Sequence, residues 1–171
     1  SFVHGTDGVV LDSTYPIYRF EFINIHPATD NAEFTFNMSI DAGSNYNVTK
    51  TTTYFNTYHA EDGSGAGLGY NTNQDLAQST AFQTLAEDVG ADNDQNLGGE
   101  LTIYNPSSSV FVKHFMSRTS VTHGGNYMQD VYAAGYGNTT SDVDAIQFKF
   151  SSGAIGSGKI KLYGIKDSWW A

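Results

Sequence analysis

The sequence predicts an all-β protein: a two-sheet antiparallel β-sandwich of the jelly-roll type with one short helix. Eleven Tyr and eleven Phe residues dominate its apolar content, and aromatic side chains favour the half-buried faces of strands. Clusters of Gly, Asn, Ser and Asp, which favour turns, separate the candidate strands at short intervals. Apolar and polar residues alternate with period two in several segments, as they do in strands that bury one face.

The first two strands carry the clearest alternation. In Tyr15–Ile25 the aromatic residues fall on one face, while Arg19 and Glu21 fall on the other. In Ala32–Asp41 four apolar residues alternate with polar ones. The connection between them contains Pro27 and is short and polar, so we expect the two segments to form a hairpin with one apolar face.

The rest of the chain supplies six further strands, one helix and several loops. Gly63–Gly69 is rich in glycine and predicts a flexible loop. Asn73–Val89 has helical spacing of Leu and Ala residues, so we expect the one helix there, lying across one end of the sandwich. The six other expected strands are Val48–Ala60, Glu100–Tyr104, Val110–Val121, Met128–Tyr136, Ala145–Phe150 and Lys159–Ile165.

About eight strands at this spacing fit a single sandwich domain over residues 1–171. An immunoglobulin-like sandwich is the alternative fold. The sequence has no internal repeat and no linker of the kind that separates domains. We expect residues 1–13 and 166–171 to be flexible or to mediate assembly.

The charge and the residue types exclude several classes of function. A formal net charge of −10 opposes binding to nucleic acid, which needs a basic surface. No apolar run approaches the roughly 20 residues of a membrane span, so we expect no membrane insertion. The absence of cysteine excludes thiol nucleophiles, disulfides and zinc–thiolate sites.

One loop contains candidate metal ligands. Asp92, Asp94 and Asn96 place oxygen-bearing side chains at alternate positions, as at the start of a calcium-binding loop. Leu97 and Ile103 occupy the two positions where an EF-hand needs Gly and Glu. We therefore expect a solvated loop and no cofactor, and a non-standard Ca²⁺ site is the alternative.

Catalysis would require carboxylates that face each other. Glu21, Glu33 and Glu100 lie on polar faces of expected strands, and a pair of such acids is what a glycoside hydrolase uses. The sequence does not indicate that any two of them converge. We therefore predict that the protein is not an enzyme.

Aromatic residues near loops are the candidates for contact with a protein partner or a glycan. Tyrosine and tryptophan rings stack on sugars and also form dry protein contacts. Two adjacent tryptophans on one strand point to opposite faces, so at least one of the pair should find a partner, either another subunit or its own domain. The candidates are Tyr46, Tyr70, Tyr127, Tyr136, Trp169 and Trp170.

Four long strings, in this order along the chain, resemble a family of short proteins from marine tailed bacteriophages, including cyanophages. Members of this family are described as virion structural or tail-fibre-like proteins. The resemblance extends from about Tyr15 to Ile165 and transfers no catalytic residues. The strings are Phe22–Phe55, Tyr70–Phe82, Tyr104–Thr119 and Asn138–Ile165.

The resemblance implies a non-enzymatic virion structural protein on the particle exterior, either a capsid decoration or a fibre component. Its partners would be other virion proteins, including copies of itself in a homo-oligomer, and its loops would be available to a host surface glycan. Such a protein is assembled in the host cytoplasm and then becomes extracellular with the virion. The alternatives are a carbohydrate-binding host-receptor module and a polysaccharide-degrading enzyme.

Overall fold

The computed structural model describes residues 1–167, and in this range eleven β-strands form one open antiparallel sheet without any helix. The all-β prediction is confirmed. Nothing in this range could cross a membrane as a helix. The strands are β1 (Phe2–Val3), β2 (Ile17–Pro27), β3 (Ala32–Ser39), β4 (Lys50–Ala60), β5 (Ala66–Tyr70), β6 (Gln83–Val89), β7 (Leu97–Tyr104), β8 (Lys113–His123), β9 (Tyr127–Gly137), β10 (Ala145–Phe150) and β11 (Ile155–Ile165).

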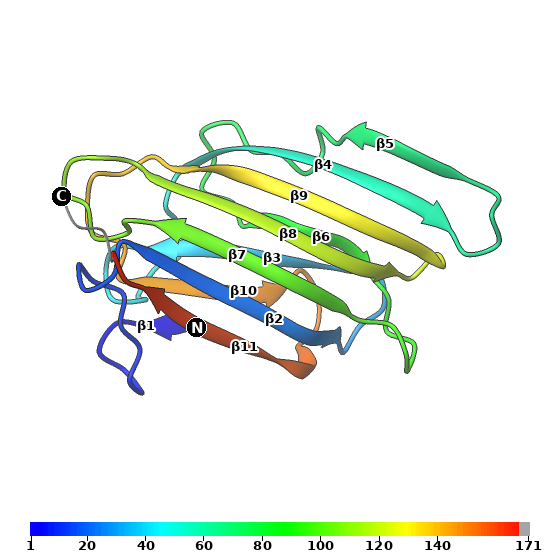
Figure 1. The fold of residues 1–171 in the computed structure, drawn as a ribbon, viewed down its shortest axis with the longest axis horizontal. Helices are drawn as coiled ribbons and strands as arrows, with labels where there is room; N and C mark the ends of the chain where they lie inside the picture. The colour runs from blue at the N-terminus through cyan, green and yellow to red at the C-terminus, as the bar shows by residue number, and fades with distance from the viewer. Residues whose placement is uncertain (168–171) are drawn as a thin grey trace.

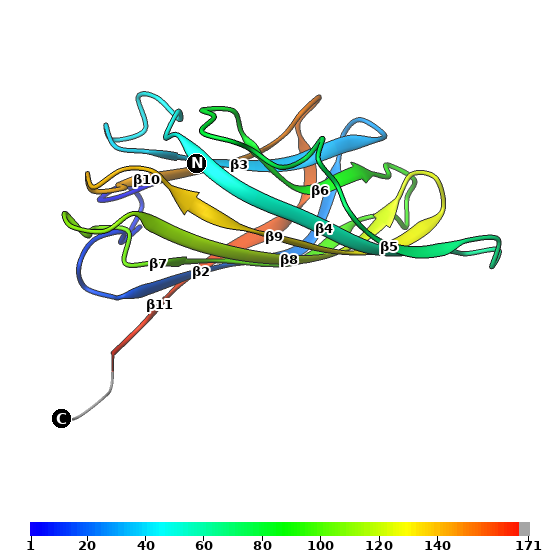
Figure 2. The same cartoon turned by 90° about the horizontal axis from the view of Figure 1, so that it is seen from above.

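Neighbouring strands follow the order β1-β10-β3-β6-β8-β7-β2-β11, while β9 pairs with β8, β4 with β9 and β5 with β4 (Figure 1). Only one residue pair, Val89 with His123, joins β6 to β8. At this narrow connection the sheet bends, so that its two parts lie one above the other as two layers (Figure 2). We call β1, β10, β3 and β6 the short layer, and β11, β2, β7, β8, β9, β4 and β5 the long layer.

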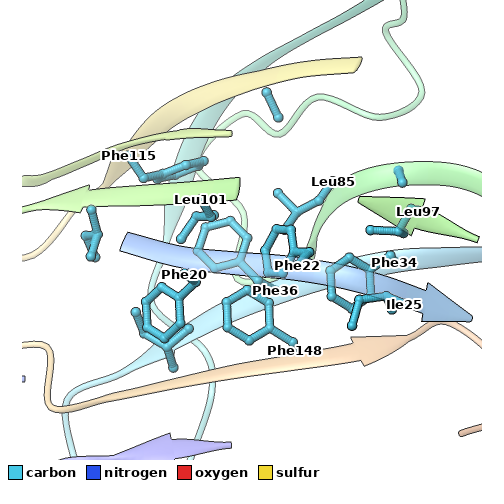
Figure 3. Close-up of a cluster of buried hydrophobic side chains, with 14 of the residues drawn as sticks. Phe20, Phe22, Ile25, Phe34, Phe36, Leu85, Leu97, Leu101, Phe115 and Phe148 are labelled. Atoms are coloured by element: carbon cyan, nitrogen blue, oxygen red, sulfur yellow. The ribbon is translucent and has the colours of Figure 1, made fainter. Parts of the chain in front are cut away.

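An aromatic cluster fills the space between the two layers (Figure 3). The ring of Phe148, on β10, lies at its centre, with its centroid 5.1–6.3 Å from those of five other phenylalanines. Two of the five belong to β2 of the long layer and two to β3 of the short layer. The expected hairpin of Tyr15–Ile25 with Ala32–Asp41 is wrong, because β2 pairs with β7 and β11 while β3 pairs with β6 and β10. The apolar faces of the two segments instead face each other across the core. The five are Phe2, Phe20, Phe22, Phe34 and Phe36.

The prediction of a helix at Asn73–Val89 is wrong. Residues 83–89 form strand β6, and the preceding residues run beside the edge of β4. The backbones of Lys50 and Ser79 exchange two hydrogen bonds, and the amide of Leu76 donates to the hydroxyl of Thr52. Gln78 has a φ of 48°, which no right-handed helix accommodates. The backbone groups of this segment therefore bond to a neighbouring strand.

The glycine-rich segment Gly63–Gly69 also differs from the expectation of a flexible loop. Its second half belongs to β5, which pairs with β4 over the register Phe55–Tyr70 to His59–Ala66. A side chain at Gly67 would collide with the ring of Tyr58, which lies over this strand. Glycine here lets an edge strand approach a large aromatic residue on its neighbour.

The N-terminal residues contribute to both the sheet and the core. Phe2 pairs with Ile146 of β10, and Leu11 is fully buried. The imidazole Nδ1 of His4 accepts a hydrogen bond from the amide of Leu11. The segment before β2 thus covers the end of the aromatic cluster.

Lys50, at the start of β4, is fully buried. Its ammonium group donates to the side-chain oxygen of Asn37 at 2.5 Å and to the carbonyl of Val48 at 2.8 Å. None of the ion pairs among the described residues includes it. Burial without a counter-charge lowers the pKa of Lys50 to about 7, because the protein interior disfavours the charged form.

Candidate binding face

The long layer has one side that the short layer does not cover. Along β8, residues alternate regularly between buried and exposed, so that Phe115 and Ser117 point inward while Met116 and Arg118 point outward. We call the outward side of β4, β9, β8, β7 and β2 the outer face. It is the candidate functional site because it gathers aromatic, charged and apolar side chains from strands far apart in the sequence.

A single row of residues in register crosses the middle of the outer face. Phe55 pairs with Tyr132, Tyr132 with Arg118, Arg118 with Glu100, and Glu100 with Glu21. The rings of Phe55 and Tyr132 are stacked, with centroids 4.9 Å apart and planes 3° from parallel. The guanidinium of Arg118 lies 5.1 Å from the centroid of the Tyr132 ring. Three side chains thus form a continuous stack, which we call the central ridge.

Arg118 is also held by Asp130 of β9. Its Nε and Nη2 atoms donate to the two carboxylate oxygens at 3.0 and 2.8 Å. This paired hydrogen bond lowers the pKa of Asp130 and raises that of Arg118, because each charge stabilises the other. Tyr132 adds a hydroxyl 3.3 Å from the same carboxylate. The guanidinium is therefore fixed in position by two neighbours.

A polar hollow of about 540 Å³ lies on one side of the central ridge. Its charged residues are Glu21, Glu100, Arg118 and Asp130, and Ser120 adds a hydroxyl. The other lining residues are Phe22, Ile23, Gly98, Gly99 and Met128.

An apolar hollow of about 480 Å³ lies on the other side of the ridge. Ala134, a small residue on β9, lies between Thr53 and Met116 in the register of the sheet. The ring of His114 packs edge-on to Tyr136, and the hydroxyl of Tyr104 approaches the sulfur of Met116. The lining is completed by Thr51, Thr52, Phe115 and Gly135.

The loop between β7 and β8 presents a rigid apolar tip at the same end of the sheet. Val110 and Phe111 are 67% and 68% exposed. Lys113, which is fully buried, donates from its Nζ to the carbonyls of Ser108, Phe111 and Thr139. Burial lowers the pKa of Lys113, and the nearby Asp142 opposes that shift. The buried ammonium therefore holds the loop in one conformation.

The predicted aromatic contact residues do not converge on one site. Tyr136 lines the apolar hollow, and Tyr70 pairs with Phe55 at the edge of the long layer. Tyr46 lies in the loop after β3, where its carbonyl accepts from Asn37. Tyr127 begins β9 and packs edge-on to Tyr58 and His123 at the opposite end of the sheet. Trp169 and Trp170 lie outside the described residues.

The structure brings together two of the three candidate carboxylates. Glu21 and Glu100 are direct cross-strand partners on the outer face. Glu33 belongs to β3 of the short layer, where it accepts hydrogen bonds from Gln74 and Thr84. Sequence patterns could not reveal the pairing of Glu21 with Glu100, because it depends on which strands become neighbours.

The candidate metal ligands lie in the loop between β6 and β7. Asp92 and Asp94 are exposed, while Gln95, which follows Asp94, is buried, and its backbone amide donates to the carbonyl of Asp92. Asn96 is half-buried, and its carbonyl accepts from Thr122. Within residues 1–167 no three His, Asp or Glu side chains are grouped so as to hold a metal ion.

Sequence reasoning missed the residues of the central ridge. Arg118, Tyr132 and Phe55 each lie on an expected strand, facing away from the core. The signal that could have found them is the alternation in Val110–Val121, which carries apolar residues on both faces and thereby indicates a strand with an unusual exposed side.

No protein-family model, no curated protein and no solved structure matches this chain. The resemblance to phage virion proteins is therefore a hypothesis about this chain, and its function has to be inferred from the geometry of its own residues.

Proposed function

We propose that this protein is a non-enzymatic structural component of the exterior of a tailed-phage virion, acting by protein–protein assembly as a capsid decoration or fibre component. The observation that carries this proposal is the rigid apolar tip of Val110 and Phe111, held by the buried Lys113. Contiguous exposed apolar surface marks sites that bind other proteins, and this tip lies at the same end of the sheet as the apolar hollow.

The hydrogen bonds that hold the tip favour a role for Val110 and Phe111 in an interface over an exposure without function. Ordering a loop on binding costs conformational entropy, and three hydrogen bonds from Lys113 restrict this loop beforehand. Aromatic side chains that enter a partner's pocket provide much of the binding energy of protein interfaces. The apolar hollow, lined by Tyr104, His114, Met116 and Tyr136, offers a surface of matching character on a second copy. The proposal therefore includes a homo-oligomer built by this contact.

The same proposal includes a fold of the jelly-roll sandwich type, in which the short and long layers are the two sheets. Its support is the nesting of strand pairs from the ends of the chain toward its middle: β2 with β11, β3 with β10, β4 with β9, and β7 with β8. Nested antiparallel pairs are the pattern of a jelly roll, a fold that capsid proteins use.

The proposal places the protein first in the host cytoplasm, where particles assemble, and then outside the cell with the released virion. A sequence without cysteine can fold in both surroundings, because no disulfide has to form. Quantitative mass spectrometry of purified particles, with immunogold labelling, tests this placement. We expect a stoichiometric copy number and labels on the outer surface of the particle. Absence of the protein from purified particles would contradict the proposal.

Replacing Val110 and Phe111 by serine is expected to weaken self-association at least about tenfold, because the double variant removes the aromatic anchor of the interface. Sedimentation equilibrium of wild type and variant measures this change. Leu68→Ser is the matched control, since Leu68 is 72% exposed on β5 and lies away from the tip. A wild-type chain that stays monomeric, or an equal loss in the control, would argue against the tip as the interface.

A further inference from the structure

The polar hollow contains hydrogen-bonding groups that its own side chains do not use. Among the described residues, the Glu21 carboxylate has no hydrogen bond or ion pair, although Glu100 is its direct cross-strand partner. Among the same residues, the carboxylate of Glu100 has one interaction, an ion pair with Arg19 at 3.5 Å. Arg118 uses two of its five N–H groups on Asp130. Acceptors and donors are therefore both available at one place.

Two like charges directly opposite each other on a sheet destabilise it. Glu21 and Glu100 have this arrangement, while Lys161 of β11 is the partner of Glu21 on its other side. Hydrogen-bond donors placed between the two carboxylates would relieve the remaining repulsion. The arrangement thus favours a ligand that carries several donors.

The balance of charge limits the class of ligand further. Three carboxylates, from Glu21, Glu100 and Asp130, oppose an anion, and the neighbouring cations of Arg19 and Lys161 offset much of their charge. The guanidinium of Arg118 at the same hollow opposes a cation, and it requires acceptors on the ligand. A neutral molecule that carries several hydroxyl groups both donates to the carboxylates and accepts from the guanidinium. The apolar parts of Met128 and Ile23 complete a lining that suits the C–H groups of a sugar ring.

We infer that the polar hollow is a binding site for a neutral sugar residue of a glycan. The hydroxyls of the sugar donate to Glu21 and Glu100 and accept from Arg118. This site goes beyond the assembly role, because it lies across the central ridge from the apolar hollow and uses other residues. A glycan longer than one residue would continue across the strands, from β8 over Tyr132 on β9 to Phe55 on β4.

The site is built on strands and needs little ordering. Arg118 is fixed by the paired hydrogen bonds with Asp130 and by the ring of Tyr132. Glu21 and Glu100 lie on central strands of the long layer, each paired on both sides. Polar groups held in place beforehand lose less entropy when the ligand binds.

The hollow exists because position 98 has no side chain. Gly98 pairs with Ser120 of β8, another small residue that lines the hollow. A Cβ atom at Gly98 would meet only the carbonyl oxygen of Phe22, at 3.7 Å. A larger residue there would fill the hollow without a clash in the sheet. Gly69 on β5 is a matched position, since a Cβ atom there would meet nothing within 4 Å.

The test is binding of the full chain to an array that carries neutral hexose and N-acetylhexosamine oligosaccharides beside sialylated and sulfated ones. The wild type and Gly69→Leu are expected to bind neutral glycans. Gly98→Leu and Arg118→Gln are expected to reduce that binding at least about tenfold, because one fills the hollow and the other removes the fixed guanidinium. Self-association of Gly98→Leu should equal that of the wild type, which separates this site from the assembly surface.

Three results would overturn the inference. The first is that no neutral glycan binds, and the second is that Gly98→Leu binds as well as Gly69→Leu. The third is that the hollow binds a basic peptide. Oligolysine would then bind to the wild type but not to Gly98→Leu, and no sugar would displace it. Release of a shorter glycan by the wild type, abolished in Glu21→Gln, would replace the binding site with a hydrolytic one.

Discussion

Replacing Phe148 by alanine is expected to lower the free energy of unfolding by about 3–5 kcal/mol. The Phe148 ring packs against five other phenylalanines and joins the short layer to the long layer. Its removal leaves a cavity between layers whose β-strands cannot move together to close it. A loss of this size is a large part of the stability of an ordinary domain, and urea unfolding followed by circular dichroism measures it.

The matched control is Leu68→Ala, a large-to-small substitution at an exposed position away from the apolar tip. Leu68 is 72% exposed on β5, so the free energy of unfolding should change by no more than about 0.5 kcal/mol. Equal losses in the two variants would mean that the aromatic cluster does not hold the layers together.

The stability of the protein is expected to rise between about pH 7 and pH 9 because of Lys50. In the unfolded chain a lysine has its ordinary pKa of about 10.4, whereas burial lowers the pKa of Lys50 to about 7. Between these values the unfolded state binds one more proton than the folded state, and stability then increases with pH. Below pH 7 both states are protonated and the full cost of the buried charge is present. From pH 6 to pH 9 the gain amounts to about 2–3 kcal/mol.

Lys50→Met is expected to remove this pH dependence, because methionine does not titrate. Lys161→Met, at an exposed position on β11, is expected to retain it. Urea unfolding at four pH values from 6 to 9 measures the slopes. The range stops there because burial raises the pKa of Tyr54, so ionisation of this tyrosine in the unfolded chain lowers stability above about pH 10. Equal slopes for Lys50→Met and wild type would show that Lys50 is not the group responsible.

The strands with strong alternation could be predicted closely from the sequence. Ala145–Phe150 coincides with β10, and Ala32–Asp41 differs from β3 only at its end. In both strands the phenylalanines of one face pack in the core. The polar residues between them in β3, Thr35, Asn37 and Ser39, are buried as well, and hydrogen bonds satisfy their side chains. The alternation was therefore sufficient to locate the strands, although it did not indicate that both faces of β3 are buried.

Strand β6 could not be predicted because its pattern is ambiguous. Leu85 and Ala86 are both buried, and with Leu76 and Ala77 they give the spacing of a helical face. The backbone partners decided the outcome: the segment before β6 bonds to Lys50 and Thr52 of β4. β5 was missed for a related reason, since its glycines carry no periodicity and the strand exists only where β4 offers an edge.

The outer face could not be predicted because it depends on register. Alternation indicates that Glu21 and Glu100 both point away from the core, but not that β2 and β7 are neighbours. Tyrosines near loops were the predicted contact residues. The row that crosses the sheet instead places Phe55, Tyr132 and Arg118 on three strands. Only the order of the strands brings these residues together.

The nesting of the strand pairs also determines when the molecule can reach its folded state during synthesis. Ile17, at the start of β2, pairs with Ile165, at the end of β11. This pairing cannot form until β11 has been synthesised and has left the ribosome. Phe148 likewise reaches Phe20 and Phe34 only after most of the chain has been made. Contacts between distant parts of the sequence slow the search for the native state. The apolar faces of β2 and β3 therefore stay without these partners until β10 and β11 have been synthesised, and protection from premature aggregation is most needed during this interval.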